Sequence, residues 1–347
     1  MKLGTFVFPT SADPRDDGRV IKEAMHEAQL SEELGMDAVW LAEHHFDGMC
    51  AYVDPVVFAA AVARATRHVR IGFAVVQASL HHPLRLAEQI SLLDHLTEGR
   101  LLAGLGKGSM YNDYEYEAFE IDPADASARF DELEEILLAS WTGERLVHRG
   151  RFWNFEIPML RPRPFTKPHP ALLRAMGSET SVLKHAKTGR PFLFAGPADI
   201  VLARAALMRR AMAENGHGPE HIAAAFDQSW VWQHVVVAAT DAEAHAIGME
   251  AVKGYIEYRE GLGLKSTLAQ IMRAGIAGGG SPRGYIFGAP ETVAERLAPF
   301  AQAGLGGLII RFDIGPIASE TSLASLRLFA RHVAPALRAV AKPQPVS

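Results

Sequence analysis

Three titratable residues stand in a row in this sequence. Glu43, His44 and His45 directly follow the apolar run 38–42. A histidine can exchange a proton near neutral pH, and a carboxylate beside it adjusts how readily it does so. The first interpretation is therefore proton transfer by one histidine, adjusted by Glu43. A helix cap or a solvated loop is an alternative. A metal site is another, but the usual short histidine spacing on one helix face is missing, so we expect no metal.

A second segment whose residues could bind a ligand is "GLGKG", residues 104–108. Gly106 and Gly108 leave the backbone open to a ligand, and Lys107 between them supplies a positive charge, which suits a phosphate. The spacing matches neither a Walker loop nor the glycine pattern of dinucleotide-binding folds. Glycines also serve tight turns, so this signal alone decides nothing.

Hydroxyl side chains follow a later apolar run. Ser178, Thr180 and Ser181 stand where a helix is expected to begin, at about residue 178. They are candidates for capping that helix. They are also candidates for holding a phosphate at its N-terminus. The two functions are compatible.

The elements that must position these residues repeat a simple pattern. Eight short, mostly apolar runs are each followed by a helix-like segment, and the runs are 2–8, 38–42, 70–76, 100–106, 170–176, 191–195, 229–239 and 306–312. This alternation predicts a parallel sheet buried on both faces. Eight units favour an α/β fold of the (β/α)₈ TIM barrel type, in which the C-terminal ends of the strands carry the site. The glycine and hydroxyl segments follow the fourth and fifth strands, so we expect them to be neighbours on the rim.

No linker divides the chain, so we predict a single domain over residues 1–347. Two intervals are too long for simple loops. Residues 143–169, after the fourth strand, contain a hairpin-like piece and are interpreted as an insertion. Residues 264–288, before the eighth strand, are predicted to be a mobile loop, with 264–284 as a lid over the site. Three tryptophans near strand ends, Trp40, Trp230 and Trp232, are candidates for barrel core or for a pocket wall.

Composition limits the function classes. Hydrophobic residues make up 48% and charged residues 22% of the chain, and the formal net charge is -5. This mild charge without a basic cluster argues against nucleic acid as a partner. A single cysteine, Cys50, excludes an internal disulfide and favours a reducing compartment. We expect no signal peptide and no membrane span, and therefore a cytoplasmic protein.

Three segments together resemble a known family. "LAEHHF", "GFAVVQASLHHPLRLAEQISLLDHLTEGRLLAGLGKG" and "GAPETVAERL" occur in the same order as in the bacterial luciferase-like flavin-dependent monooxygenases. The resemblance implies a (β/α)₈ barrel, often a homodimer, that binds reduced FMN supplied by a separate flavin reductase. It also implies O₂ as co-substrate, a flavin C4a-peroxide, and oxygenation of a small organic substrate.

The resemblance assigns roles to individual residues. His44 matches the acid/base histidine near the flavin, with Glu43 and His45 beside it. Lys107 stands where bacterial luciferase has an arginine that binds the flavin phosphate. Gly106 replaces a cysteine of luciferase. The other matched positions are the flavin-facing pair Ala74 and Val75, often joined by a cis peptide bond, the phosphate-binding hydroxyls Ser178 and Ser181, and Phe6 on the apolar floor.

Other functions stay open at this point. The nearest rival is a barrel oxidoreductase that uses the deazaflavin F420. Others are a non-catalytic flavin-binding barrel and a metal-dependent hydrolase, against which the lack of a spaced ligand set speaks. The sequence does not distinguish hydroxylation, Baeyer–Villiger insertion, epoxidation and aldehyde oxidation.

Overall fold

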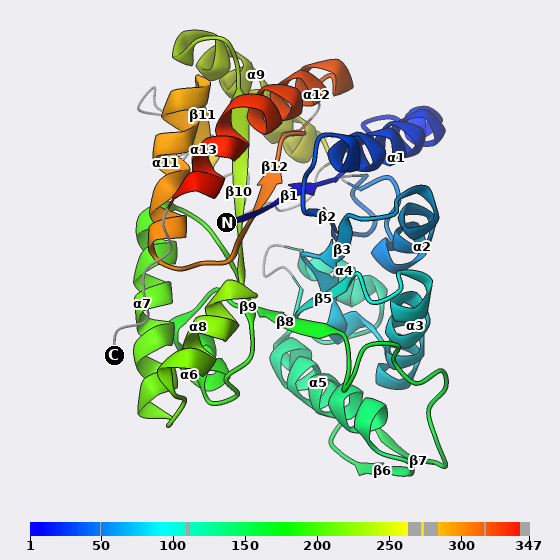
Figure 1. The fold of residues 1–347 in the computed structure, drawn as a ribbon. Helices are drawn as coiled ribbons and strands as arrows, with labels where there is room; N and C mark the ends of the chain where they lie inside the picture. The colour runs from blue at the N-terminus through cyan, green and yellow to red at the C-terminus, as the bar shows by residue number, and fades with distance from the viewer. Residues whose placement is uncertain (49, 109–111, 263–271, 274–283, 316, 341–347) are drawn as a thin grey trace.

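The protein is a closed barrel of eight parallel strands (Figure 1). The computed structural model describes residues 1–48, 50–108, 112–262, 272–273, 284–315 and 317–340. The ring closes because β10 pairs with both β9 and β12, and β12 pairs with β1. The predicted TIM barrel is confirmed. In ring order its strands are β1 (Lys2–Phe6), β2 (Ala38–Leu41), β3 (Arg70–Phe73), β5 (Leu101–Gly106), β8 (Ala171–Ala175), β9 (Phe192–Ala195), β10 (Trp230–Val237) and β12 (Gly307–Arg311).

Helices surround this sheet on the outside (Figure 1). They follow the strands in the predicted alternation, with α4, α8 and α11 as additions. The bounds are α1 (Asp17–Glu33), α2 (Pro55–Ala65), α3 (Pro83–Leu96), α4 (Asp113–Ala118), α5 (Ala126–Thr142), α6 (Glu179–Ala186), α7 (Ala198–Glu214), α8 (Pro219–Asp227), α9 (Asp241–Gly261), α11 (Pro290–Gln302), α12 (Ser319–Leu328) and α13 (Ala334–Ala339). A π-helical turn, Phe329–Val333, lies between α12 and α13.

The third barrel strand is shorter than the apolar run 70–76. Strand β3 ends at Phe73, and the peptide bond between Ala74 and Val75 is cis. The chain then resumes as β4 (Val76–Gln77), which pairs with β5. The cis bond implied by the family resemblance is confirmed.

The two long intervals differ in outcome. Within 143–169, strands β6 (Leu146–Arg149) and β7 (Asn154–Ile157) form the expected antiparallel hairpin. The end of 264–288 is not a loop, because β11 (Tyr285–Gly288) pairs in parallel with β10. This apolar strand follows a glycine-rich stretch and is only four residues long, so its pattern is weak. The predicted lid over 264–284 lies outside the described residues, apart from Met272, Arg273 and Gly284.

Two indole rings fill the centre of the barrel. Trp40 and Trp230 are almost fully buried, with ring centroids 5.0 Å apart. A Cβ atom on Gly72 would lie 2.4 Å from Trp40, and one on Gly307 would lie 2.2 Å from Trp230. Glycine inside a strand commonly marks such a close approach. The core interpretation is therefore confirmed for these two tryptophans.

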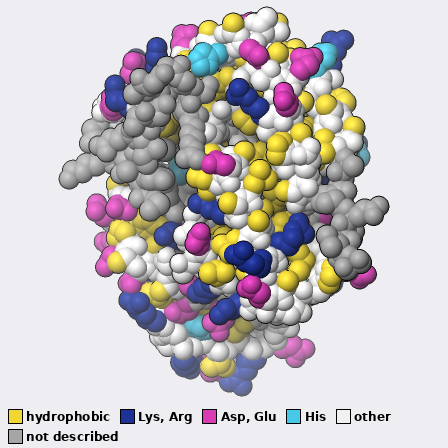
Figure 2. Space-filling model, turned by 90° about the vertical axis from the view of Figure 1, so that its left-hand side faces the viewer, with side chains coloured by type: hydrophobic (Ala, Val, Ile, Leu, Met, Phe, Trp, Pro, Cys, Tyr) yellow, Lys and Arg dark blue, Asp and Glu magenta, His cyan; other side chains and the backbone are white. Residues whose placement is uncertain are grey.

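The surface mixes charges of both signs. Figure 2 shows the side of the molecule on which α7 and α11 lie in Figure 1, with acidic and basic side chains scattered among apolar ones. Among the residues that the structure describes, no helix is both long and apolar enough to cross a membrane.

Candidate active site

Glu43 is the centre of a buried hydrogen-bond cluster at the C-terminal end of β2. His45 Nε2 and His81 Nε2 each lie 2.9 Å from its carboxylate. The backbone N–H of Gln77 donates to Oε2 at 2.7 Å. Burial alone would raise the pKa of Glu43, but the hydrogen bonds from His45 and His81 outweigh it and lower the pKa to about 2. Glu43 is therefore ionised at neutral pH.

His44 has a different carboxylate partner. Its Nδ1 atom lies 3.3 Å from Oε1 of Glu115, on α4. Of the histidines beside it in sequence, Glu43 contacts His45 and not His44, because consecutive side chains diverge and its carboxylate faces His45 and His81. Sequence reasoning missed Glu115, which is 71 residues away. The available signal was an acidic residue in "YNDYEYE", just after the fourth strand.

Glu115 is fully buried and accepts several hydrogen bonds. The backbone N–H of His45 donates to Oε1 at 2.7 Å, and Gln77 Nε2 donates to Oε2 at 2.9 Å. Burial would raise the pKa of Glu115, but these donors and His44 lower it below its ordinary value. Gln77 Nε2 also donates to the backbone oxygen of Glu43 at 2.9 Å, so it connects the two carboxylate clusters.

The His44 ring lies partly open at this rim. Its side chain is 28% exposed, and Phe8 packs edge-on against it with ring centroids 5.4 Å apart. Asn112 Nδ2 lies 3.2 Å from Nδ1. Within the described part of the chain, Nε2 has no hydrogen-bond partner, so it is the ring nitrogen available for chemistry.

Below His44 lies an aromatic floor. Phe6, the predicted floor residue, is buried, stacks on Phe8 at 5.5 Å and meets Trp232 edge-on at 5.6 Å. Arg311 lies over Phe8, with Cζ 4.5 Å from the ring centroid. Such a floor excludes water from whatever binds above it.

Buried polar atoms near this floor have no partner among the described residues: Trp232 Nε1, His234 Nδ1 and Arg311 Nη2. Burial, with Arg311 nearby, holds the pKa of His234 well below its ordinary value, so this ring is neutral. Buried polar groups normally find hydrogen-bond partners. The aromatic floor and these unpartnered atoms fit a planar group with polar edges, such as a flavin or an organic substrate.

Ala74 and Val75 lie between the floor and the glycine segment. The Ala74 N–H donates to Leu41 O at 2.7 Å, and Glu43 N–H donates to Val75 O at 3.0 Å. The cis peptide bond is thus held by the strand end that carries Glu43. A Cβ on Gly106 would lie 2.8 Å from a methyl group of Val75, so these two predicted cofactor residues are in contact.

Close packing within the protein requires glycine at positions 104 and 108. Gly108 has φ of +103°, and a Cβ there would meet Tyr116 at 2.2 Å and Gln77 at 2.6 Å. A Cβ on Gly104 would meet the Phe73 carbonyl oxygen at 1.7 Å. Close packing therefore accounts for these glycines. That the backbone of residues 104–108 also approaches a bound ligand stays a prediction.

Lys107 and the hydroxyl segment lie on adjacent parts of the rim. Strands β5 and β8 pair in parallel, with Leu105 opposite Arg174, so the loops that follow them are neighbours. Lys107 is exposed and has no ion-pair partner in the described part of the protein. The strand order had predicted that the loop with Lys107 and the loop with Ser178, Thr180 and Ser181 are neighbours, and the strand pairing confirms it.

The hydroxyl segment caps α6. Ser178 Oγ accepts from Ser181 N–H at 3.3 Å, and Ser181 Oγ accepts from Ser178 N–H at 3.2 Å. Thr180 is exposed. The capping interpretation is confirmed, and it leaves the helix N-terminus facing solvent. A cation and a helix N-terminus with hydroxyls form a donor set that suits a phosphate.

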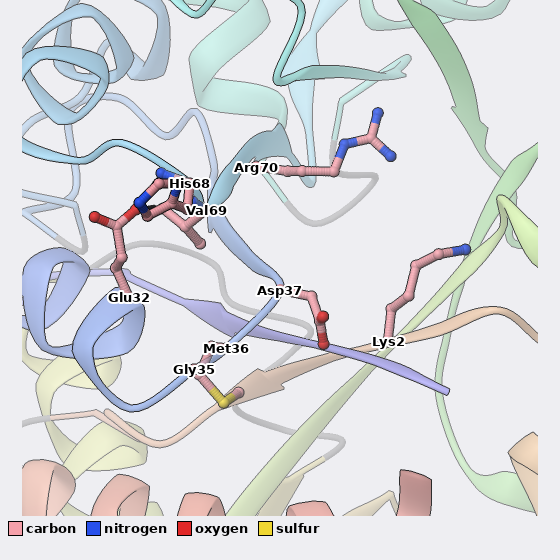
Figure 3. A pocket seen from close by; sticks show the side chains of 8 residues that line it. All are labelled: Lys2, Glu32, Gly35, Met36, Asp37, His68, Val69 and Arg70. Atoms are coloured by element: carbon pink, nitrogen blue, oxygen red, sulfur yellow. Dashed lines mark hydrogen bonds between the residues drawn. The ribbon is translucent and has the colours of Figure 1, made fainter.

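A separate hollow of 420 Å³ lies at the other end of the barrel (Figure 3). Its wall includes Lys2, Asp37 and Arg70, which stand at or just before the starts of β1, β2 and β3. In barrels of this type, the N-terminal end serves stability rather than chemistry. None of the predicted site residues lines this hollow, so we place the candidate site at the His44 end.

No group of three or more His, Cys, Asp or Glu side chains in the described ranges has metal-binding geometry. The Glu43 cluster is instead held together by hydrogen bonds.

Comparison with known proteins agrees with this geometry. Residues 1–306 match the luciferase-like monooxygenase family, and the chain belongs to that family. The oxygenase component of flavin-dependent trigonelline monooxygenase from Acinetobacter baylyi is 29% identical over 173 residues, which are 50% of this chain and 48% of the relative. The chain spans about half the length of the curated relatives it matches.

Solved structures match over nearly the whole chain. Monooxygenase RslO1 from Streptomyces bottropensis has a TM-score of 0.82 and 28% identity, covering 96% of this chain and 99% of that one. The oxygenating constituent of 3,6-diketocamphane monooxygenase from Pseudomonas putida, in complex with FMN, has a TM-score of 0.78 and 21% identity, covering 99% and 100%. An F420-dependent secondary alcohol dehydrogenase has a TM-score of 0.75 and 16% identity, covering 97% and 99%. These last two likenesses show the fold alone.

Proposed function

We propose that this protein is an oxygenase that uses reduced FMN and O₂ to oxygenate a small organic substrate. One observation carries the proposal. A histidine with a carboxylate behind it, an aromatic floor and a cationic, hydroxyl-rich rim occupy the same end of one barrel. Family membership and the flavin-dependent name of the trigonelline relative support the choice of cofactor.

The residues of this chain suggest how FMN would be held. Lys107, together with Ser178, Thr180 and Ser181, would bind the phosphate. Phe6 and the segments around Ala74, Val75, Gly106 and Gly108 would lie along the ring system. Bound reduced flavin supplies the electrons that activate O₂.

The other residues would manage protons and water. His44 would accept or donate a proton at Nε2 while oxygen is transferred to the substrate. Phe6, Phe8 and Trp232 would keep water away from the reacting atoms. Glu43 would hold the loop, because its carboxylate is occupied by His45, His81 and Gln77.

We propose a separate flavin reductase as the source of reduced FMN, since the trigonelline relative is named as an oxygenase component.

We also propose a homodimer. Val57 on α2 is 67% exposed, and Leu92 and Leu96 on α3 are 52% and 43% exposed. Helices α2 and α3 pack against each other, and a contiguous exposed apolar patch marks an interaction surface. Sedimentation should give twice the 37.8 kDa chain mass, and Leu92→Glu should shift it toward one chain mass. A wild type that sediments as a single chain would contradict the dimer.

The oxygenase assignment is tested by isotope transfer. The protein, a flavin reductase, FMN and NADH are incubated under ¹⁸O₂ with a panel of ketones, aldehydes, alkenes and aromatic acids. We expect one product to gain a single ¹⁸O atom, and only when FMN and reductase are both present. Turnover with reduced F420 in place of FMN would identify the nearest rival instead. Tight flavin binding without any product would favour the non-catalytic barrel, against which the His44–Glu115 contact argues.

A further inference from the structure

We propose that Glu115 is a positioning residue that fixes the proton of the His44 ring on Nδ1 and leaves the lone pair of Nε2 facing the site. The catalytic consequence rests on the proposed function. The geometric claim does not, because it concerns a hydrogen bond within the protein.

The surroundings of Glu115 make its charge depend on hydrogen-bond donors. Its side chain is fully buried, and no Lys or Arg among the described residues pairs with it. His45 N–H and Gln77 Nε2 supply two of its hydrogen bonds, and His44 Nδ1 is the third group in contact. A buried carboxylate that accepts hydrogen bonds stays ionised, whereas one that faces a lone pair is destabilised. Glu115 therefore favours a proton on Nδ1.

Asn112 favours the opposite arrangement. Its Oδ1 atom accepts from Arg259 Nη2 at 3.3 Å, so its Nδ2 donor is the atom turned toward His44 Nδ1, at 3.2 Å. An amide donor is best satisfied by an unprotonated Nδ1. The two neighbours of this nitrogen thus require different tautomers, and only one requirement can be met.

Charge decides between them. Hydrogen bonds to an ionised partner are roughly twice as strong as those between neutral groups. Placing the lone pair of Nδ1 against the fully buried Glu115 would weaken the stronger of the two contacts. Among the charged side chains that the structure describes, Glu115 alone contacts a ring nitrogen of His44. The Nδ1–H form is therefore the one we infer.

This division separates the roles of the two carboxylates. Glu43 contacts His45 and His81 and leaves the His44 ring nitrogens untouched. Changing Glu43 should disturb those two rings, while changing Glu115 should disturb His44. The pair therefore provides a matched control within one cluster.

The test is the tautomer of His44, measured by ¹⁵N NMR of histidine-labelled protein without flavin, on the alkaline side of the ring's titration. His44→Gln identifies the resonance among 15 histidines. We expect the Nδ1–H form in the wild type and in Asn112→Ala, and conversion to Nε2–H in Glu115→Gln. Glu43→Gln should move the His45 and His81 signals only. An Nε2–H form in the wild type would overturn the proposal, whether or not the Glu115 variant folds.

A second readout concerns turnover. Glu115→Gln should lower kcat at least about tenfold, the usual scale for losing a group that orients a reactive residue, while FMN affinity changes only a few-fold. An unchanged kcat would contradict the positioning role. Failure of the proposed function is distinguishable, since it would abolish oxygenation in the wild type and leave the tautomer result as it stands.

Discussion

At the scale of single residues, the site contains two carboxylates with different histidine partners. Glu43 contacts His45 and His81, and Glu115 contacts His44. The segment "EHH" predicted a site at the C-terminal end of a barrel strand, and the structure places these three residues just after β2. It could not predict which carboxylate serves which histidine. Neighbours in sequence point apart, and the partner of His44 comes from α4, beyond two further barrel strands, β3 and β5. His81 was missed for the same reason, since its role depends on the turn after β4.

Removing His44 should separate chemistry from binding. In His44→Ala, product formation should fall about 10²-fold, the usual scale for losing an acid/base group, because Nε2 is no longer available. FMN affinity should change only a few-fold, since none of the proposed phosphate ligands is altered. Steady-state assays with product quantification and a flavin titration measure both. Unchanged coupling of the oxidation of reduced FMN to product formation would rule out this role.

Glu43 should make stability depend on pH in the acid range. Its pKa is lowered from 4.5 to about 2 in the folded protein, which corresponds to about 3 kcal/mol. Since the folded pKa lies below the unfolded one, this stabilisation is complete above pH 4.5 and is lost as the pH falls toward 2. Glu43→Gln should lack that part of the pH dependence. Urea unfolding of both proteins across this range gives the comparison, and parallel curves would refute the assignment.

At the scale of elements, the rim is built by pairs of adjacent strand ends. The apolar runs predicted all eight barrel strands, and strand order alone predicted that the loops carrying Lys107 and Ser178 are neighbours, as the pairing of β5 with β8 shows. The break after Phe73 was implied by family resemblance and not by hydrophobicity, because residues 71–76 carry no polar side chain. The sequence also left β11 unrecognised, as four residues between turns carry too little pattern.

Lys107 should anchor the phosphate at this rim. A charge-assisted contact contributes roughly 1.5–3 kcal/mol, so Lys107→Ala should weaken FMN binding about tenfold or more. Riboflavin has no phosphate and should bind both proteins equally. Arg64→Ala, on the outer helix α2, is a matched loss of charge away from the rim and should leave both affinities unchanged. Equal affinity of the wild type for FMN and riboflavin would show that the phosphate site is misplaced.

At the scale of the whole molecule, the barrel closes around two tryptophans. The sequence showed that these two side chains are large. It did not show which glycines make room for them. Gly72 lies opposite Trp40 on the adjacent strand, and Gly307 lies opposite Trp230, so each pairing becomes visible only once the strand register is known. A packed centre of this kind supports the rim above it.

Adding one methyl group inside the barrel should therefore be costly. Gly72→Ala places a Cβ 2.4 Å from Trp40, and overpacking of this kind destabilises by roughly 1–3 kcal/mol. Gly18→Ala on α1 is the matched control, because nothing lies within 4 Å of its added Cβ. The control should be as stable as the wild type or slightly more stable, since alanine favours helix. Denaturant unfolding would measure both, and equal stability of the two variants would argue against tight packing around Trp40.

The central claim is that this barrel is built for reduced FMN. The most direct measurement is an anaerobic equilibrium titration of the flavin-free protein with reduced FMN and, in parallel, with reduced F420. We predict saturable binding of one FMN per chain, with a lower Kd for reduced FMN than for reduced F420. Tighter binding of F420, or no saturable binding of FMN, would contradict the account.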